Sequence, residues 1–306
     1  MMGVVRYISH KDIDEKKWDA CIAHSPQGLV YAYSWYLNIM SPEWGALVLE
    51  DYDVVMPLTG RRKWGIHYLY QPAFCAELGV FSKEEISAEV VLSFLQQIPL
   101  RYQYIDICLN RSNRCEWDGH PFTLRRNYIL PLKASYTEIY THYSENHRRN
   151  LKKAVRNGLR FDDKIDIHIA LALSRTKLEG ISSYSDQDWK GLEQLFSKGL
   201  SQQAACCVGV RDRDDQLLSA ALFFYSHNNW YYIVAGTTKE GKVMGASHFL
   251  VDQFICQHAG TETFLDFEGS DVDSVALFYK GFGAEDMSYP SLVVNRLPIW
   301  IRWMKA

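Results

Sequence analysis

The sequence lacks the features that define several large classes of protein. It has no excess of positive charge, because 33 Lys and Arg stand against 36 Asp and Glu and leave a formal net charge of −3. A general nucleic-acid coat protein is therefore excluded, although a local basic patch is not. No uninterrupted apolar stretch approaches the roughly 20 residues that span a bilayer, and the N-terminal residues lack the apolar region of a secretory signal. We expect a cytoplasmic protein with no membrane span.

Cysteine and metal-binding patterns are equally sparse. None of the 7 Cys forms a Cys-x-x-Cys pair, and Cys206 and Cys207 lie in an apolar run, so we expect reduced, structural thiols. His248 and Asp252 share a helical face but have no third ligand nearby in the sequence, and no metal site is predicted. The chain also has no nucleophile elbow, Walker loop or dinucleotide-binding glycine pattern. Nothing therefore points to those chemistries.

The composition indicates a folded chain. Hydrophobic residues make up 47% of the 306 residues and aromatic residues 14%, which is enough to form substantial packed cores. The length suits two domains of roughly 150 residues or one large α/β domain.

The most informative feature of the sequence is a long-range internal repeat. Each copy has an amphipathic helical segment, a meander of three strands, a second helix, a strand with a central Asp and a final strand. In the first copy these segments are 18–23, then 46–50, 54–58 and 65–70 with a turn at Arg61-Arg62-Lys63, then 84–97, 104–107 and 127–132. In the second copy they are 189–195, then 207–210, 217–225 and 230–235, then 245–258, 264–267 and 291–297.

The repeat predicts two copies of one mixed α/β unit, offset by about 160 residues. The strand–helix–strand step after each meander predicts one parallel pair in a largely antiparallel sheet. We expect an N-terminal domain at 1–140, a basic junction helix at 141–165 and a C-terminal domain at 166–306.

A basic helix is predicted between the two copies. Residues 146–160 contain six Lys and Arg and no acid, and Gly158 is suited to end the helix. At 100° per residue the cations spread over about 140° of one face, while Leu151, Ala154 and Val155 lie opposite. Either this face is solvated or it binds an anion at a domain junction, such as a nucleotide diphosphate, the phosphates of CoA or a tRNA end. The candidate anion-binding residues are Arg148, Arg149, Lys152 and Lys153.

Three segments resemble one known family. They are residues 147–159, the motif Leu265-Asp266-Phe267-Glu268-Gly269-Ser270 with the later segment 278–284, and residues 71–81. Together they are similar to the FemAB-like branch of the GNAT (acyl-CoA N-acyltransferase) superfamily, over roughly residues 40–296. The resemblance implies an α/β (mixed α+β) fold of two tandem GNAT-like domains, each a mostly antiparallel sheet flanked by helices.

The resemblance also implies where an acyl donor binds. GNAT domains hold the donor's pyrophosphate on backbone N–H groups where a strand leads into a helix. The matching positions are in the second copy: Ala235, Gly236, Lys242, Gly245, Ala246 and Ser247. Acetyl-CoA or another acyl-CoA is the expected co-substrate, with no metal. We expect Gly245→Asp to abolish donor binding and to leave the fold intact.

Catalytic candidates follow from the same resemblance and from the chemistry of N-acylation, which needs a base, oxyanion-stabilising dipoles and an acid. Tyr279 lies near the position of the GNAT acid. Asp266 and Glu268 alternate with apolar residues, so one side of a strand is expected to carry both as candidate bases. Lys280 is a candidate for balancing negative charge on the donor.

Three functions remain open from the sequence. The first is an N-acyltransferase that moves an acyl group from a CoA thioester to a small-molecule or peptide amine bound between two GNAT-like domains. The second is a Fem-type ligase that uses aminoacyl-tRNA and acts on a peptidoglycan precursor. The third is a non-catalytic binding protein with the same fold. The acceptor and the oligomeric state are left open.

Overall fold

The chain divides into two compact units. The computed structural model describes residues 3–178, 184–269, 271–299 and 302. Unit 1 comprises Met1–Arg125 and Ser288–Ala306, and unit 2 comprises Arg126–Met287. These limits differ from the expected boundaries at 140 and 165. The reason is that the last strand of the chain belongs to unit 1.

Unit 1 contains two sheets. Their strand orders are β1–β2–β3–β6 and β4–β5–β7–β16–β8. The strands are β1 (Arg6–Ile8), β2 (Gly45–Leu49), β3 (Val54–Leu58), β4 (Gly60–Lys63), β5 (Ile66–Leu69), β6 (Phe81–Ser82), β7 (Tyr102–Cys108), β8 (Phe122–Arg125) and β16 (Tyr289–Asn295). The α-helices are α1 (Glu15–His24), α2 (Ser34–Met40) and α3 (Ala88–Gln96). Only Thr59 separates β3 from β4, so the two strands together correspond to one long strand that is interrupted at Thr59.

Unit 2 contains one sheet with the order β10–β11–β12–β13–β14–β9–β15. The strands are β9 (Tyr128–Pro131), β10 (Arg160–Asp162), β11 (Ala205–Arg211), β12 (Leu217–Ser226), β13 (Asn229–Thr237), β14 (Phe264–Asp266) and β15 (Glu285–Asp286). The helices are α4 (Tyr136–Thr141), α5 (Glu145–Arg156), α6 (Ile167–Leu178), α7 (Asp186–Ser201), α8 (Lys239–Met244), α9 (Ala246–His258) and α10 (Asp273–Lys280).

Both units repeat one strand order. In unit 2, β11, β12 and β13 are antiparallel neighbours, β14 runs parallel to β13, and β9 runs antiparallel to β14. In unit 1, β2, the β3–β4 pair and β5 take the corresponding places, β7 runs parallel to β5, and β16 runs antiparallel to β7. The predicted mixed α/β repeat with one parallel pair per copy is confirmed.

Each unit receives one strand from the other half of the sequence. The early strand β9 pairs with β14 and β15 of unit 2, and the late strand β16 pairs with β7 and β8 of unit 1. The assignment of segments 127–132 and 291–297 to their own copies is therefore wrong. Leu130 is 4% exposed and Leu292 fully buried, so both strands carry the apolar residues that either sheet needs. Alternation fixes which face of a strand is buried but not which sheet it joins.

The expected helices form, and one expected turn does not. The segments at 18–23 and 189–195 lie within α1 and α7, while 84–97 and 245–258 contain α3 and α9, which begin four residues and one residue later than expected. Arg61, Arg62 and Lys63 belong to β4 and pair with β5 instead of forming the turn. The turn falls on Trp64 and Gly65, whose φ angles are 51° and 81°. Two consecutive positive φ angles match the twist of a two-residue hairpin.

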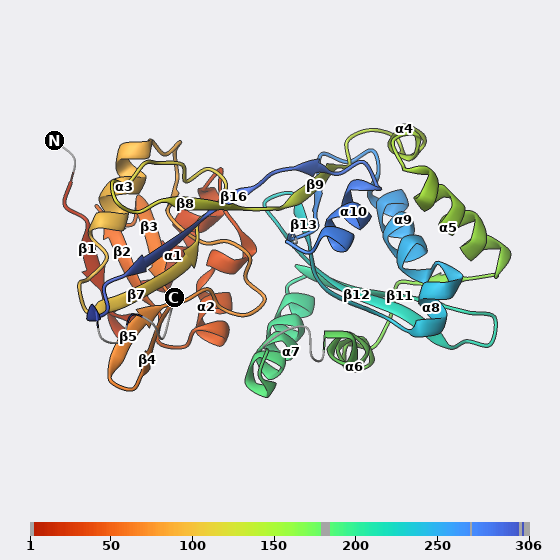
Figure 1. Cartoon of the computed structure of the whole chain (residues 1–306), viewed down its shortest axis with the longest axis horizontal. Helices are drawn as coiled ribbons and strands as arrows, with labels where there is room; N and C mark the ends of the chain where they lie inside the picture. The colour runs from red at the N-terminus through yellow and green to blue at the C-terminus, as the bar shows by residue number, and fades with distance from the viewer. Residues whose placement is uncertain (1–2, 179–183, 270, 300–301, 303–306) are drawn as a thin grey trace. The chain divides into compact units, whose positions relative to one another are not determined.

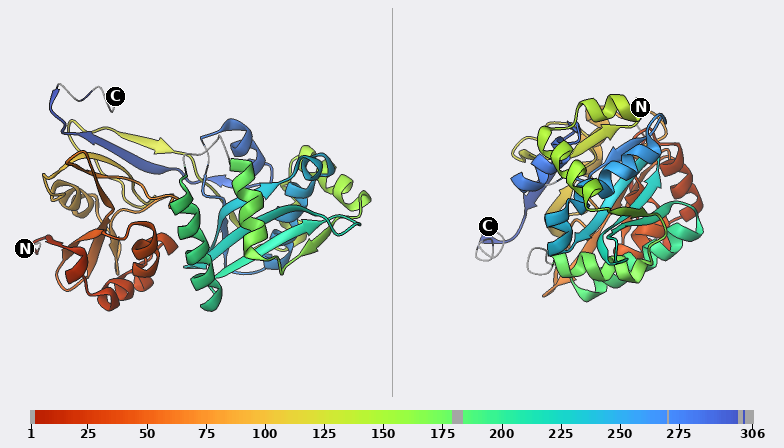
Figure 2. Two further views of the ribbon diagram at one scale, coloured as in Figure 1. Left: turned by 90° about the horizontal axis from the view of Figure 1, so that it is seen from below. Right: turned by 90° about the vertical axis from the view of Figure 1, so that its right-hand side faces the viewer.

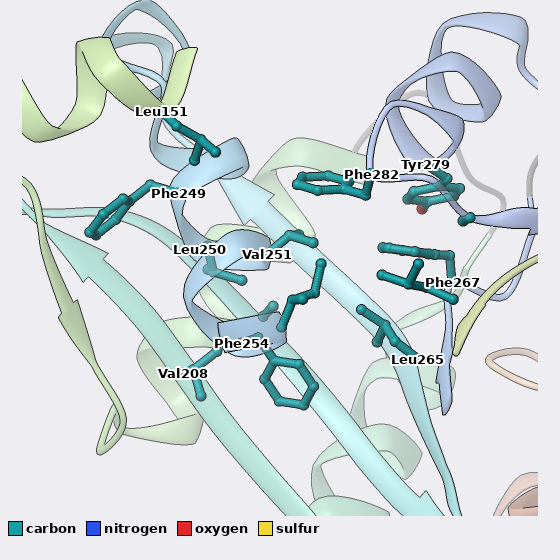
Figure 3. Close-up of a cluster of buried hydrophobic side chains, with 14 of the residues drawn as sticks. Leu151, Val208, Phe249, Leu250, Val251, Phe254, Leu265, Phe267, Tyr279 and Phe282 are labelled. Atoms are coloured by element: carbon teal, nitrogen blue, oxygen red, sulfur yellow. The ribbon is translucent and has the colours of Figure 1, made fainter. Parts of the chain in front are cut away.

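Helices cover both faces of the unit 2 sheet. α6 and α7 pack on one face, while α5, α9 and α10 lie on the other (Figure 1). Seen from below, α6 and α7 lie side by side across the strands (Figure 2). The core on the α9 face joins Phe254 and Leu250 of α9 to Leu265 of β14 and to Tyr279 of α10 (Figure 3). Among the described residues no helix is long and apolar enough to cross a membrane.

Candidate active site

A tight turn at the end of β14 positions the two acidic candidates. β14 ends at Asp266, and the Oδ1 atom of Asp266 accepts a hydrogen bond of 2.9 Å from the backbone N–H of Glu268. Glu268 has a φ of 60°, in the left-handed region. Asp266 and Glu268 therefore do not share one side of a strand, and that expectation is wrong. The cause is the turn, because β14 ends at Asp266 and its alternation does not continue to Glu268.

Glu268 is half-buried, and one oxygen of its carboxyl group is shielded from solvent. Its Oε1 atom is buried and has no hydrogen-bond partner among the described residues. Burial raises the pKa of this carboxyl well above its ordinary range, because the charged form loses hydration. A desolvated carboxyl with no partner is costly for folding alone, and such groups are concentrated at functional sites.

Tyr279 lies in the same part of unit 2. Its side chain is 9% exposed, and its ring stacks on Phe267 with 4.5 Å between ring centroids. Tyr232 of β13 approaches it edge-on at 6.3 Å. Burial, followed by the charges of Tyr232 and Glu268, raises the pKa of the Tyr279 phenol. Tyr279 thus packs on Phe267, the residue before Glu268, and its phenol stays protonated.

The other two catalytic candidates occupy different surroundings. The Asp266 side chain is 2% exposed, and its hydrogen bond holds the turn that carries Glu268. Lys280 is exposed, and its Nζ atom lies 5.4 Å from the centroid of the Tyr128 ring. Asp266 therefore positions its neighbour, whereas Lys280 faces solvent. Ser270, the last residue of the motif, lies outside the described residues.

The expected donor loop lies between β13 and α9. Ala235 and Gly236 are near the end of β13, Lys242 is exposed on α8, and Ala246 and Ser247 begin α9. The hydroxyl of Ser247 donates a hydrogen bond of 3.1 Å to Oγ1 of Thr237. This hydrogen bond connects the start of α9 to the end of β13.

Packing accounts for the two glycines of this loop. A Cβ atom on Gly236 would lie 2.6 Å from the backbone of Leu173 in α6, and one on Gly245 would lie 2.6 Å from the carbonyl oxygen of Asn150 in α5. Gly245 also has a φ of 85°. Gly245→Asp would therefore disturb the packing of α5, and the expectation that it leaves the fold intact is wrong.

The basic helix α5 contacts α8 and α9, so the anion-binding candidates lie beside the donor loop. Leu151 and Ala154 are buried as expected, but Val155 is 66% exposed and does not belong to the buried face. The helix turns by 100° per residue, and this carries Val155 past the contact with α9. Gly158, with a φ of 71°, follows the end of the helix as predicted.

The four anion-binding candidates differ in their contacts. Arg148 donates a hydrogen bond of 2.6 Å to the carbonyl of Thr141, and its guanidinium lies 5.7 Å from the Tyr140 ring centroid. Arg148 therefore anchors the end of α4. Arg149 is exposed and donates a weak bond of 3.4 Å to Asn146. Lys152 is exposed and Lys153 is half-buried.

A pair of histidines, not predicted from the sequence, joins α5 to its neighbours. The ring of His147 lies 2.8 Å from the carbonyl of Phe278 and 2.9 Å from the hydroxyl of Ser144, and 4.6 Å separates its centroid from that of His248. Burial, and then the proximity of His147, lowers the pKa of His248 to about 4. Both rings are neutral at pH 7 and serve packing. In the sequence, the spacing of Ser144 and His147 is typical of a helix N-cap, and it indicates that the two residues lie close together.

Comparisons with known proteins identify the fold. No protein-family model matches the chain, and no curated protein matches it. The crystal structure of FemX matches with a TM-score of 0.65 and 12% identity, covering 96% of this chain and 99% of FemX. L-PGS from Bacillus licheniformis matches with a TM-score of 0.54 and 11% identity, covering 95% of each chain. The C-terminal domain of a putative lysylphosphatidylglycerol synthetase from Agrobacterium fabrum matches with a TM-score of 0.51 and 9% identity, covering 95% and 94%.

The chain therefore has the fold of FemX and L-PGS, and the FemAB-like fold of two mixed α/β units that the motifs predicted is confirmed. Because the identities are about one residue in ten, these matches establish the fold alone.

Proposed function

We propose that this protein is an acyltransferase of the GNAT and Fem type, which moves an acyl or aminoacyl group onto an amine. The observation that carries the proposal is the buried, unpartnered Oε1 atom of Glu268, next in sequence to Phe267, on whose ring the buried Tyr279 stacks. Amine acylation needs an acceptor for the proton of the amine and a donor for the leaving group. In its ionised form the Glu268 carboxylate accepts a proton, and its raised pKa makes it a stronger base than an ordinary Glu, while the protonated phenol of Tyr279 donates a proton.

Each residue has a defined task in this proposal. Glu268 takes the proton of the acceptor amine while the C–N bond forms at the acyl carbonyl. Tyr279 gives its proton to the leaving oxygen or sulfur as the C–O or C–S bond breaks. Asp266 holds the turn that positions Glu268, and Lys280 offsets negative charge on the donor from the solvent side.

We infer aminoacyl-tRNA as the donor, in preference to acetyl-CoA or another acyl-CoA. The absence of side chains at Gly236 and Gly245 is already required by α6 and α5, so these glycines do not argue for a pyrophosphate cradle. The basic residues of α5 suit a polyanion, and Arg149 and Lys153 are the two we assign to it. The name of the putative lysylphosphatidylglycerol synthetase includes lysyl, which is an aminoacyl group, and this agrees with an aminoacyl donor. The acceptor we propose is a small-molecule or peptide amine, and the setting is cytoplasmic.

The test is a kinetic comparison of two variants. Label transfer from charged tRNA to the free amine of a lysyl peptide is measured for the wild type, Glu268→Gln and Glu262→Gln. Glu262 is the matched control because it is a surface residue paired with Lys133. We expect Glu268→Gln to lower the rate by about 100-fold or more, the usual worth of a general base, and Glu262→Gln to leave it unchanged. Equal rates for all three proteins would refute the role of Glu268.

The same assay separates the alternatives. Transfer from acetyl-CoA, with none from charged tRNA, would replace the inferred donor with a CoA thioester. Absence of transfer from either donor would assign the chain to the non-catalytic binding proteins of this fold.

A further inference from the structure

Unit 2 contains a cavity that none of the catalytic candidates lines. It has a volume of about 760 Å³ and lies where α4, α5 and α9 meet. This volume is within the range of roughly 300–1,000 Å³ typical of small-molecule sites. Its lining residues are Tyr136, Tyr140, Leu151, Lys152, Val155, Arg156, Phe249, Asp252 and Gln253. Figure 3 shows Leu151 of α5 and Phe249 of α9 close together where these helices meet.

The walls of the cavity are mostly apolar. Phe249 and Leu151 belong to the core of unit 2 and present one side to the cavity. Val155 is 66% exposed on a helix whose other exposed residues are polar or charged. The exposed side chain of Val155 lines the cavity together with Phe249 and Leu151, and this apolar surface is suited to contact the apolar part of a ligand.

Two cations line the same cavity. Lys152 and Arg156 are one turn apart on α5, both are exposed, and neither side chain has a hydrogen bond or ion pair among the described residues. Like charges at this spacing repel by a few tenths of a kcal/mol. An anion between them would remove that repulsion.

The acidic residue of the cavity is already engaged. Asp252 is 4% exposed, and its Oδ1 atom accepts a hydrogen bond of 2.8 Å from the hydroxyl of Tyr136. Its Oδ2 atom accepts a bond of 3.2 Å from Gln253. Both oxygens of this carboxyl are therefore occupied by hydrogen bonds within the cavity wall. Asp252 therefore holds Tyr136 in the cavity wall. The positive charges of Lys152 and Arg156 then favour a negatively charged ligand.

We propose that this cavity binds a small amphipathic anion, with an apolar tail against Phe249, Leu151 and Val155 and a carboxylate or phosphate held by Lys152 and Arg156. The proposal does not depend on the proposed transfer reaction, because no residue assigned to that reaction lines the cavity. The ligand class is a soluble single-chain carboxylate or phosphate monoester.

The test is a calorimetric titration with octanoate and with octyl phosphate. The variants are Lys152→Gln with Arg156→Gln and, as a matched control, Arg149→Gln with Lys153→Gln. Both remove two charges from α5, but only the first pair lines the cavity. We expect the first pair to weaken binding by about tenfold or more, the loss corresponding to roughly 1.4 kcal/mol, and the control pair to change it less than about twofold. The tighter of the two probes identifies the head group.

Two further measurements keep the proposal open to refutation. Val155→Glu places a negative charge in the cavity at an exposed position that tolerates substitution, and we expect it to abolish octanoate binding. Octanol, which has the same tail without the charge, should bind much more weakly than octanoate. The proposal is overturned if octanoate and octyl phosphate do not bind, if both double variants lose affinity equally, or if octanol binds as tightly as octanoate. Because the titration contains no acyl donor or acceptor, its outcome is independent of the transfer assay.

Discussion

At the scale of single residues, Glu268 is the most informative group in the molecule. Its left-handed backbone and its desolvated carboxyl are both unfavourable for folding alone. Asp266 and the surrounding core hold it in place regardless. The combination agrees with a proton acceptor that is arranged before the substrate arrives.

The raised pKa of Glu268 has a consequence for stability. Between the ordinary pKa of a Glu and the higher value in the folded protein, the folded state binds more protons than the unfolded state. The carboxyl therefore lowers the free energy of unfolding as pH rises, by at most about 1.4 kcal/mol per pH unit. In Glu268→Gln this loss is absent, so the variant should gain stability relative to the wild type from about pH 4.3 upward. Denaturant unfolding over a pH series measures it, and parallel curves would contradict the assigned burial.

Gly245 gives a prediction about packing. Gly245→Ala forces a side chain into the left-handed region and brings a Cβ atom to 2.6 Å from the carbonyl of Asn150. Gly260 has a φ of 79° but open space around its Cα atom, so Gly260→Ala isolates the backbone cost of about 1–2 kcal/mol. We expect Gly245→Ala to lose roughly 1–3 kcal/mol more than Gly260→Ala in the free energy of unfolding. Equal losses would show that α5 moves aside freely.

At the scale of elements, the exchange of β9 and β16 makes each unit depend on a strand from the other half of the sequence. β16 places Leu292 in the core of unit 1, and β9 places Leu130 in the core of unit 2. The early and late parts of the chain are therefore both needed for each core.

Leu292→Ala tests this exchange. Removing a fully buried leucine side chain should cost about 2–5 kcal/mol, whereas Val293→Ala, at a residue 48% exposed, should cost less than about 1 kcal/mol. The effect should be local to unit 1. Hydrogen exchange should accelerate at Ile105 and Ile107 of β7 and stay unchanged in β12. Acceleration in β12 instead would contradict the pairing.

The sequence predicts the local elements well and the long-range pairing less well. The meanders and helices have clear periodicities, so α9 and β12 are found close to their observed limits. The exchange of β9 and β16 is not predictable from periodicity, because Leu130 and Leu292 would be buried equally well in either sheet. The burial of Glu268 is also not predictable, since a charged residue with positive φ departs from the alternation that the motif suggests. Val155 is misassigned because it lies at the edge of the apolar face of α5, beside a cavity that α9 does not fill.

At the scale of the whole molecule, the match to FemX covers 96% of this chain and 99% of FemX, so the shared fold includes both units. The proposed chemistry uses unit 2, where Glu268 and Tyr279 lie. We propose that unit 1 contributes to binding the acceptor.

The most direct test of the proposed function is single-turnover transfer by the intact chain. Purified protein in excess is mixed with a tRNA pool charged with radiolabelled amino acids, or with labelled acetyl-CoA, in the presence of a lysyl peptide. We predict that label moves from tRNA to the peptide amine and that Glu268→Gln slows this step without weakening tRNA binding. Binding of charged tRNA with no movement of label, or transfer that is equally fast in Glu268→Gln, would contradict the account.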